Sequence, residues 1–482
     1  MKNESKLTTN YIFNLLNRII VIIIPLITTP YLTRVLGAKE LGIYNYVNTI
    51  ASYYLMLAML GMSILGNKLI SLSRANNSTS EVFSRLFSIQ LLNSMISIFM
   101  YVIYLMFFCK SNRTIALIQL FYIISAIFDV SWFLQGLEKF KSIAIRNVFV
   151  NCVTTIFIFC FVKNESDLII YTYIKCISVL VSQLLLIVSC VNKFKWITPK
   201  KKEIINIYKQ LFILFVPVAA ESIFHNMDRV MIGMFIDYGA VAIYYTSRMI
   251  TDIPQCLVTS INTIMYPRIT SLIGQNNIDK ANELTYLSFE IINILCIAMA
   301  FGISAIASDF VKLYLGNEYQ YCAICLPWLA PYIVMAAWNG TVRYQYLLPN
   351  SKEKVYSNAI VFGIVTNLFL NLIFINFLGI IGAILATIIS EFITGVVQSK
   401  AVLHEMLLTK HLRNMIIYCF VGLFMWFIIK YISSHFVVTL FVKIICEVLI
   451  GGISYLIIIL IIIPLIDDNI RHFVEKIGWW KK

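Results

Sequence analysis

Charged residues are scarce in this sequence. Asp, Glu, Lys and Arg make up 13% of the 482 residues, whereas 60% of the residues are hydrophobic. A soluble domain carries about a quarter of its residues as charged side chains, which keep its surface in water. This composition therefore excludes a water-soluble fold, and the apolar surplus predicts a chain that lies in a lipid bilayer.

Short motifs of enzyme active sites are missing as well. No G-x-x-x-x-G-K-[ST], H-E-x-x-H or G-x-S-x-G occurs, which excludes a P-loop, a zinc-protease helix and a nucleophile elbow. The connections between apolar runs are short, and none could house a catalytic domain. A membrane-embedded polymerase or ligase would be expected to carry catalytic residues on a long outer loop. We therefore expect a transporter rather than an enzyme.

Metal-ligand spacings are also lacking. The eleven cysteines are scattered, mostly within apolar runs, and Cys322 and Cys325 form a lone C-x-x-C. This pattern is typical of small hydrophobic residues in helices rather than of zinc ligands or a disulfide framework. The net charge of +14 does not gather in one basic patch, which argues against nucleic-acid binding. We expect no metal, no cofactor and no nucleic-acid partner.

Apolar runs long enough to cross a bilayer recur along the whole chain. A window of about 19 residues places the spans at approximately 11–33, 42–66, 82–108, 114–136, 143–162, 167–191, 204–236, 239–266, 284–308, 322–347, 356–376, 380–403, 412–430 and 437–465. The first run is too long for the core of a signal peptide. The predicted fold class is an all-α membrane protein with about 14 transmembrane helices.

Basic residues predict the orientation of the chain. About 25 of them fall in alternate connections, among them the segment Lys193–Lys209, and about 7 fall in the remaining connections. Lys and Arg accumulate on the cytoplasmic side of short loops. We therefore expect a multi-pass protein of the cell (inner or plasma) membrane with both termini in the cytoplasm.

A short internal repeat divides the chain. Gly37–Tyr44 after the first span and Asp237–Tyr244 after the seventh share a turn signal, small residues and an Ile-Tyr pair. An even number of spans per repeat gives two halves with the same orientation. The sequence thus predicts an N-terminal six-helix bundle at 1–195, a C-terminal six-helix bundle at 196–405, and two additional helices with a cytoplasmic tail at 406–482.

Several ionisable residues lie inside predicted spans, where one charge costs about 2.5 kcal/mol or more. Four of them follow helical spacing in the seventh span and share one stripe: Glu221, His225, Asp228 and Arg229. Such a stripe can hold a proton near neutral pH, or it can be a static ion network that fixes helix packing. The static alternative applies equally to Arg248 with Asp252 and to Lys443 with Glu447.

Basic residues within spans are candidates for the lining of an interior cavity. They are Arg18, Lys175, Arg229, Arg248 and Arg343. A planar guanidinium donates two parallel hydrogen bonds to phosphate oxygens, which suits an anionic headgroup. Arg18 and Arg343 lie near span ends, so snorkelling to the membrane interface is the alternative for these two.

Three segments carry a resemblance to a known family. They are Pro30–Tyr44, Asp129–Phe140 followed by Ile145-Arg146-Asn147, and Asp228-Arg229 with Gly233 and Ile243-Tyr244. The chain resembles the Wzx-type polysaccharide and O-antigen repeat-unit flippases of the multidrug/oligosaccharidyl-lipid/polysaccharide flippase superfamily. The resemblance covers nearly the whole chain, and Trp132–Lys139 is its most specific block.

The resemblance implies two six-helix bundles in a V around a central cavity, with two extra C-terminal helices, working by alternating access. It implies that undecaprenyl-diphosphate-linked oligosaccharide repeat units are flipped from the cytoplasmic to the outer leaflet for lipopolysaccharide, capsule or exopolysaccharide synthesis. Coupling to H⁺ or Na⁺ is expected. The implied partners are the lipid-linked oligosaccharide, membrane lipids, and a polysaccharide polymerase with other assembly proteins.

Residue roles follow from the same resemblance. The residues expected at the diphosphate are Arg18, Arg34, Lys175, Arg229, Arg248 and Arg343. Those expected to couple transport to an ion are Asp129, Glu221, His225, Asp228 and Asp252. The alternatives are a multidrug or small-molecule antiporter and a peptidoglycan lipid-precursor flippase of the same superfamily. A drug exporter would place fewer cations in its cavity.

The orientation predicts how engineered cysteines react. With the native cysteines replaced, Lys201→Cys should react with a membrane-impermeant thiol reagent only after the cells are permeabilised, because the Lys193–Lys209 connection is cytoplasmic. Lys110→Cys, in a predicted outer connection, is the matched control and should react in intact cells. Labelling of Lys201→Cys in intact cells would contradict the predicted orientation.

Overall fold

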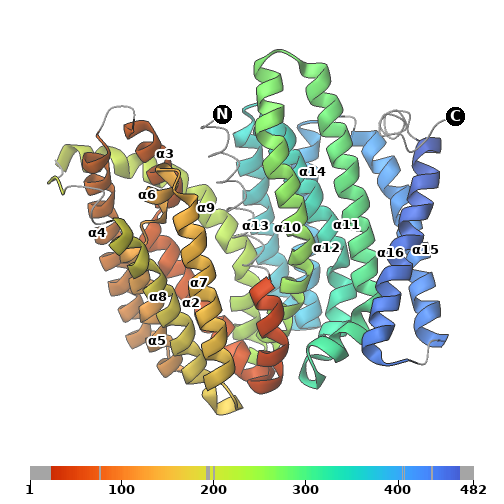
Figure 1. Cartoon of the computed structure of the whole chain (residues 1–482), viewed down its shortest axis with the longest axis horizontal. Helices are drawn as coiled ribbons and strands as arrows, with labels where there is room; N and C mark the ends of the chain where they lie inside the picture. Colours follow the sequence, from red (N-terminus) through yellow and green to blue (C-terminus); the bar gives the residue numbers. More distant parts are fainter. Residues whose placement is uncertain are drawn as a thin grey trace. The chain divides into compact units, whose positions relative to one another are not determined.

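The computed structural model describes residues 23–74, 78–190, 196–198, 201–403, 405–406, 408–435 and 438–466. Every regular element within these ranges is a helix (Figure 1). A helix satisfies its backbone N–H and C=O groups with hydrogen bonds inside the helix, whereas hydrocarbon offers them no partner. The predicted all-α membrane fold is confirmed. Most of the first predicted span, including Arg18, lies outside the described residues.

Twelve stretches of the described residues are long and apolar enough to cross a membrane. They match the predicted spans two to seven and nine to fourteen. Their outward faces are strongly apolar; Phe377, for example, is 82% exposed and Phe107 is 71% exposed. The eighth predicted span, 239–266, lies within helix α10 (Tyr238–Gly274), which is not among the twelve. The protein is therefore a multi-pass membrane protein.

The helices fall into two compact units, residues 1–242 and 243–482. Helix α9 (Lys201–Phe235), predicted as the first helix of the second bundle, packs in the first unit against α2 (Gly37–Met59), α3 (Met62–Ser73) and α4 (Thr79–Phe107). The domain limits 1–195, 196–405 and 406–482 stay a prediction, as does the arrangement of the two bundles.

In the first unit, α2 is the element on which most others pack. It contacts α4, α5, α8 and α9, while α5 and α7 both pack on α8. The remaining elements of this unit are a helix at 23–35, α5 (Arg113–Ile124), η1 (Ser125–Phe128), α6 (Ser131–Gly136), α7 (Phe140–Phe161), η2 (Glu165–Asp167) and α8 (Leu168–Cys190).

In the second unit, α11 (Ile278–Tyr314) has the central position. It packs on α12, α15 and α16, and α14 packs on α12 and α13 (Figure 1). The other elements are η4 (Asn317–Tyr319), α12 (Cys322–Val342), the π-helical turn η5 (Arg343–Leu347), α13 (Glu353–Leu378), α14 (Ile380–Lys400), α15 (Leu408–His435) and α16 (Leu440–Ile466).

Two glycines of the family-like segments let elements of the first unit approach closely. A Cβ on Gly42 of α2 would lie 1.6 Å from the carbonyl oxygen of Tyr238. A Cβ on Gly233 of α9 would lie 2.3 Å from Cδ2 of Tyr46. Small residues serve close helix packing in membranes, where backbones must approach one another. These glycines of the family-like segments are therefore packing positions.

We expect Gly42→Ala to lower the stability of the purified protein by about 1–3 kcal/mol or more, because the added methyl group meets backbone rather than a movable side chain. The measurement is the thermal unfolding midpoint in detergent. Gly452→Ala is the control, since a Cβ there meets no atom within 4 Å. Equal midpoints for the two variants would contradict this packing.

Candidate transport site

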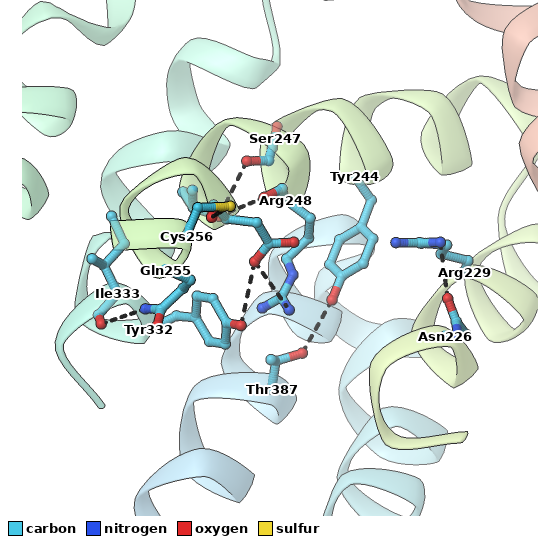
Figure 2. A network of polar contacts seen from close by, with 12 residues as sticks. Asn226, Arg229, Tyr244, Ser247, Arg248, Gln255, Cys256, Tyr332, Ile333 and Thr387 are labelled. Atoms are coloured by element: carbon cyan, nitrogen blue, oxygen red, sulfur yellow. Dashed lines mark hydrogen bonds and ion pairs between the residues drawn. The ribbon is translucent and has the colours of Figure 1, made fainter. Parts of the chain in front are cut away.

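The seventh-span stripe lies on α9 of the first unit. Asp228 is 2% exposed, whereas Glu221 and Arg229 are half-buried and His225 is exposed. The Nη1 atom of Arg229 donates to Oδ1 of Asn226 at 2.9 Å (Figure 2). Tyr53 of α2 interacts electrostatically with both Asp228 and Arg229. Asp228 and Arg229, the last two residues of the stripe, are thus the ones that interact with α2.

Two other predicted cations of the first unit lie on separate helices. Arg34 is exposed on the helix at 23–35, and its Nη1 atom donates to the carbonyl of Pro30 at 2.7 Å. Lys175 is half-buried on α8. Arg18 lies outside the described residues. The roles of these three at a diphosphate stay predictions.

Asp129 lies at a break in a membrane-spanning segment. Helix α5 continues into η1, Asp129 is extended, and α6 starts at Ser131. The Oδ1 atom of Asp129 accepts a hydrogen bond from the backbone N–H of Ser131 at 3.0 Å. This carboxylate therefore satisfies a free N–H at the start of a helix, as a capping residue does. Its predicted role in ion coupling stays a prediction.

Gln90 of α4 bridges this break. Its Nε2 atom donates to the carbonyls of Ala126 at 2.6 Å and Asp129 at 2.9 Å. Its Oε1 atom accepts from the indole Nε1 of Trp132 at 2.8 Å. One buried amide thus satisfies the groups that the interrupted helix frees, which a bilayer could not do. Sequence reasoning missed Gln90, because its partners lie about 40 residues further along the chain.

Trp132, in the most family-specific block, is a packing residue. It is fully buried, and its ring lies against Phe83 at a centroid distance of 5.6 Å. A Cβ on Gly66 of α3 would lie 2.7 Å from this indole. In the family-specific block Trp132–Lys139, the indole of Trp132 therefore packs α6 against α3 and α4.

Arg146 makes a polar contact between two helices. It lies within the predicted span 143–162, on α7, and is half-buried. Its Nη1 atom donates to Oγ of Ser182 at 2.6 Å and to Oε1 of Gln183 at 3.2 Å. It thereby ties α7 to α8. The family-like context Ile145-Arg146-Asn147 was the one signal available.

In the second unit, Arg248 and Asp252 of α10 form the predicted pair. Nη2 of Arg248 lies 3.7 Å from Oδ1 of Asp252, and the side chains are 6% and 44% exposed. Tyr332 of α12 contacts both: its hydroxyl donates to Oδ1 of Asp252 at 3.3 Å, and Cζ of Arg248 lies 3.7 Å from its ring centroid (Figure 2). The guanidinium is held by a carboxylate and an aromatic face.

Arg343 begins the π-helical turn η5 at the end of α12. Its Cζ atom lies 4.0 Å from the ring centroid of Tyr356 and 4.7 Å from that of Tyr344. Cation–π contacts hold such a guanidinium without neutralising it. π-turns recur at functional sites. Arg343 thus lies against two aromatic rings, and its predicted role at a diphosphate stays a prediction.

Sequence reasoning missed a buried contact between a histidine and a glutamate in the second unit. The Nδ1 atom of His411 on α15 contacts Oε1 of Glu290 on α11, and both side chains are almost fully buried. The hydroxyl of Tyr418 donates to Oε2 of Glu290 at 2.5 Å. This cluster joins α15 to α11. His411 gave no signal because its partner lies 121 residues away.

The ion pair of Lys443 in the structure is with a different acid from Glu447, the one four residues along the chain. Nζ of Lys443 instead lies 2.7 Å from Oδ2 of Asp309 on α11. Helical spacing made Glu447 the nearest acid in sequence, but the neighbouring helix offers a closer one. Among the described residues no group of three or more His, Cys, Asp or Glu could hold a metal ion.

A family model described as "Polysaccharide biosynthesis protein" matches residues 7–273, more than half of the chain. The chain belongs to this family. A curated relative from Shigella dysenteriae, named "Putative O-antigen transporter", is 22% identical over 385 residues, which cover 78% of this chain and 95% of that protein. The family expected from the motifs is therefore confirmed.

Two solved structures share the fold of this chain. One is titled as the lipid II flippase MurJ in an inward closed conformation, with a TM-score of 0.74 and 16% identity; the match covers 95% of this chain and 100% of that one. The other is an inward-facing multidrug resistance MATE family transporter, with a TM-score of 0.62, 13% identity, and coverage of 82% and 94%. At such identities the likeness shows the fold alone.

We expect Gln90→Leu to lower the stability of the purified protein by about 1–3 kcal/mol or more, since it leaves the indole N–H and two carbonyls without their partner. The thermal unfolding midpoint in detergent is the measurement. Gln275→Leu is the control, because Gln275 is exposed at the end of α10 and bonds only one hydroxyl of its own helix among the contacts described. A Gln90→Leu midpoint equal to the control would contradict the bridging role.

Proposed function

We propose that this protein flips undecaprenyl-diphosphate-linked oligosaccharide repeat units from the cytoplasmic to the outer leaflet by alternating access. The observation that carries the proposal is the match to an O-antigen transporter over 95% of that protein's length. The family match and the twelve candidate spans support it. The product would serve the synthesis of a surface polysaccharide.

The diphosphate is proposed to bind to guanidinium groups on the transmembrane helices. Arg229, Arg248 and Arg343 are the described arginine candidates that are buried or half-buried, and the candidate Lys175 is half-buried as well. Cations are costly within a membrane and persist where they face protein or an aqueous cavity. The forked guanidinium matches phosphate oxygens, and the sugars would then occupy water while the lipid tail stays in the bilayer.

Coupling to an H⁺ or Na⁺ gradient is proposed to use acidic side chains of the same helices. Asp228 supports this best, because it is an almost fully buried carboxylate that, like the adjacent Arg229, interacts electrostatically with Tyr53. Glu221 and His225 share its stripe, and Asp252 lies beside Arg248. Asp129 has weaker support because its carboxylate caps α6.

The location proposed is the cell membrane with both termini in the cytoplasm, which rests on the distribution of basic residues. A polysaccharide polymerase and other assembly proteins would then take the flipped unit at the outer leaflet. Two alternatives come from the folds that this chain shares: a lipid II flippase and a multidrug transporter. The substrate that accumulates when the protein is absent distinguishes them.

Deletion of the gene should cause undecaprenyl-diphosphate repeat units to accumulate and surface glycan to be lost, because the units stay in the inner leaflet. Membrane lipids are extracted and identified by mass spectrometry, and surface glycan is assayed in parallel. Accumulated peptidoglycan precursor would favour the lipid II alternative. Unchanged lipids with altered sensitivity to cationic drugs would favour the multidrug transporter.

Within that assay, a plasmid carrying Arg229→Ala should fail to restore glycan export while reaching the membrane in normal amount. The expected loss is tenfold or more, since a charge-assisted hydrogen bond contributes about 1.5–3 kcal/mol. Arg74→Ala is the matched control, because Arg74 pairs with Glu138 on a half-exposed surface. Normal export by Arg229→Ala would remove this residue from the site.

A further inference from the structure

A cavity of about 610 Å³ lies between α11, α12, α14 and α15 of the second unit. Pockets that hold drug-sized molecules have volumes of about 300–1,000 Å³. Most of the lining is apolar, and Val334 and Met415 are examples. Phe392, Leu403 and Leu412 also line the cavity and are 56%, 42% and 42% exposed, so the cavity reaches the apolar outer surface of the helices. Its size and lining suit a lipophilic molecule that enters from the bilayer.

One acid and one amide stand out in this lining because they are buried. Glu391 of α14 is 5% exposed, and Asn339 of α12 is 7% exposed. Nδ2 of Asn339 donates to Oε2 of Glu391 at 2.6 Å and to the backbone carbonyl of Glu391 at 2.9 Å. The two helices therefore hold the carboxylate and the amide in a fixed relative position.

Two oxygen atoms of this pair lack a hydrogen-bond donor. Because the amide turns its N–H toward the carboxylate, Oδ1 of Asn339 points elsewhere; it is buried and has no hydrogen-bond partner among the described residues. Oε1 of Glu391 accepts no hydrogen bond from the described residues either. A buried acceptor without a donor is costly. The pair therefore suits a ligand that brings donors of its own.

The charge of the lining selects a cation. Glu391 is the one acid among the described residues that line the cavity, and no Lys, Arg or His is among them. Arg248 of α10 interacts electrostatically with Glu391, but it pairs with Asp252 at 3.7 Å and does not line the cavity. A lipid phosphate would find no basic partner here, and a hydrocarbon chain would leave both oxygens without a donor. A protonated amine supplies both the charge and the donors.

Aromatic rings complete the site. Phe301, Trp338 and Phe392 line the cavity. The indole Nε1 of Trp338 donates to Oγ of Ser399 at 2.9 Å, which holds this ring in place and uses its one donor. Aromatic faces attract cations, and more strongly where water is excluded. Such rings pack well on an apolar body that carries a positive charge.

We propose that this cavity binds a lipophilic organic amine in its protonated form. The ammonium group donates hydrogen bonds to Oε1 of Glu391 and Oδ1 of Asn339, and the apolar body fills the space beside Phe301, Val334 and Met415. None of the arginines proposed at the diphosphate lines this cavity. The amine is therefore a second class of ligand, and its binding does not depend on the proposed flippase function.

The first test compares two probes of one shape on the wild-type protein. Rimantadine carries a primary ammonium group, and in the matching adamantyl alcohol a neutral hydroxyl replaces it. The protein is placed in phosphatidylcholine nanodiscs, which offer no primary amine, and displacement of tritiated rimantadine is measured against empty nanodiscs. We expect the amine to bind about tenfold or more tightly than the alcohol, because its hydrogen bonds are charge-assisted. Equal affinities, or no saturable binding, overturn the proposal.

The second test removes the charge. Glu391→Gln should weaken rimantadine binding about tenfold or more and leave binding of the alcohol unchanged. The thermal unfolding midpoint shows whether the variant is folded. Glu353→Gln is the matched control and should bind as wild type does, because Glu353 is exposed at the start of α13. An equal loss for both probes, or a Glu391→Gln variant that keeps wild-type affinity for the amine, overturns the proposal.

A photoreactive probe locates the site on the unaltered protein. An adamantyl diazirine that carries an amino group should cross-link to lining residues of α11, α12, α14 or α15, and excess rimantadine should suppress the cross-link. Cross-links confined to other helices overturn the proposal. These outcomes are separate from the flippase test. Deletion without accumulation of lipid-linked repeat units rejects the flippase function alone, and accumulation without amine binding rejects the amine site alone.

Discussion

The lack of hydrogen-bond partners in hydrocarbon is the constraint on which the rest of this structure depends. Every backbone and side-chain polar group that enters the bilayer must find its partner inside the protein. The helices meet this need along their length. Where a helix is interrupted, at Asp129, the amide of Gln90 supplies the missing partners. The most family-specific stretch, Trp132–Lys139, thus follows a break whose freed polar groups need partners within the protein, because hydrocarbon offers none.

The same constraint requires the ionisable groups within the membrane to find partners inside the protein. Arg146 is held by Ser182 and Gln183, and His411 by Glu290, so these groups are satisfied by fixed neighbours. Arg248 lies 3.7 Å from the carboxylate of Asp252 and packs against the ring of Tyr332. A transport site needs groups that can exchange an internal partner for a substrate. Loosely held cations meet that need, and tightly bonded ones do not.

The fold could be predicted further than the site. Hydropathy located the spans closely, because each is a local property of about 20 residues. Helical spacing also found Arg248 with Asp252, which lie one turn apart. The same rule failed for Lys443, whose partner Asp309 is on another helix. Glu290 with His411 and Glu391 with Asn339 gave no pairing signal, since nothing local links residues that far apart in the chain.

By itself the sequence determined that this protein spans a membrane, that its described elements are helices, and which family it belongs to. These properties follow from composition and from short motifs, which act locally. The tertiary structure alone decided which ionisable groups meet. It shows that Asp129 accepts the first N–H of α6, that Trp132 packs against Phe83, and that Asn339 bonds Glu391. Packing brings together residues that are far apart in the chain. In a bilayer, these contacts determine at which positions a charged side chain is stable.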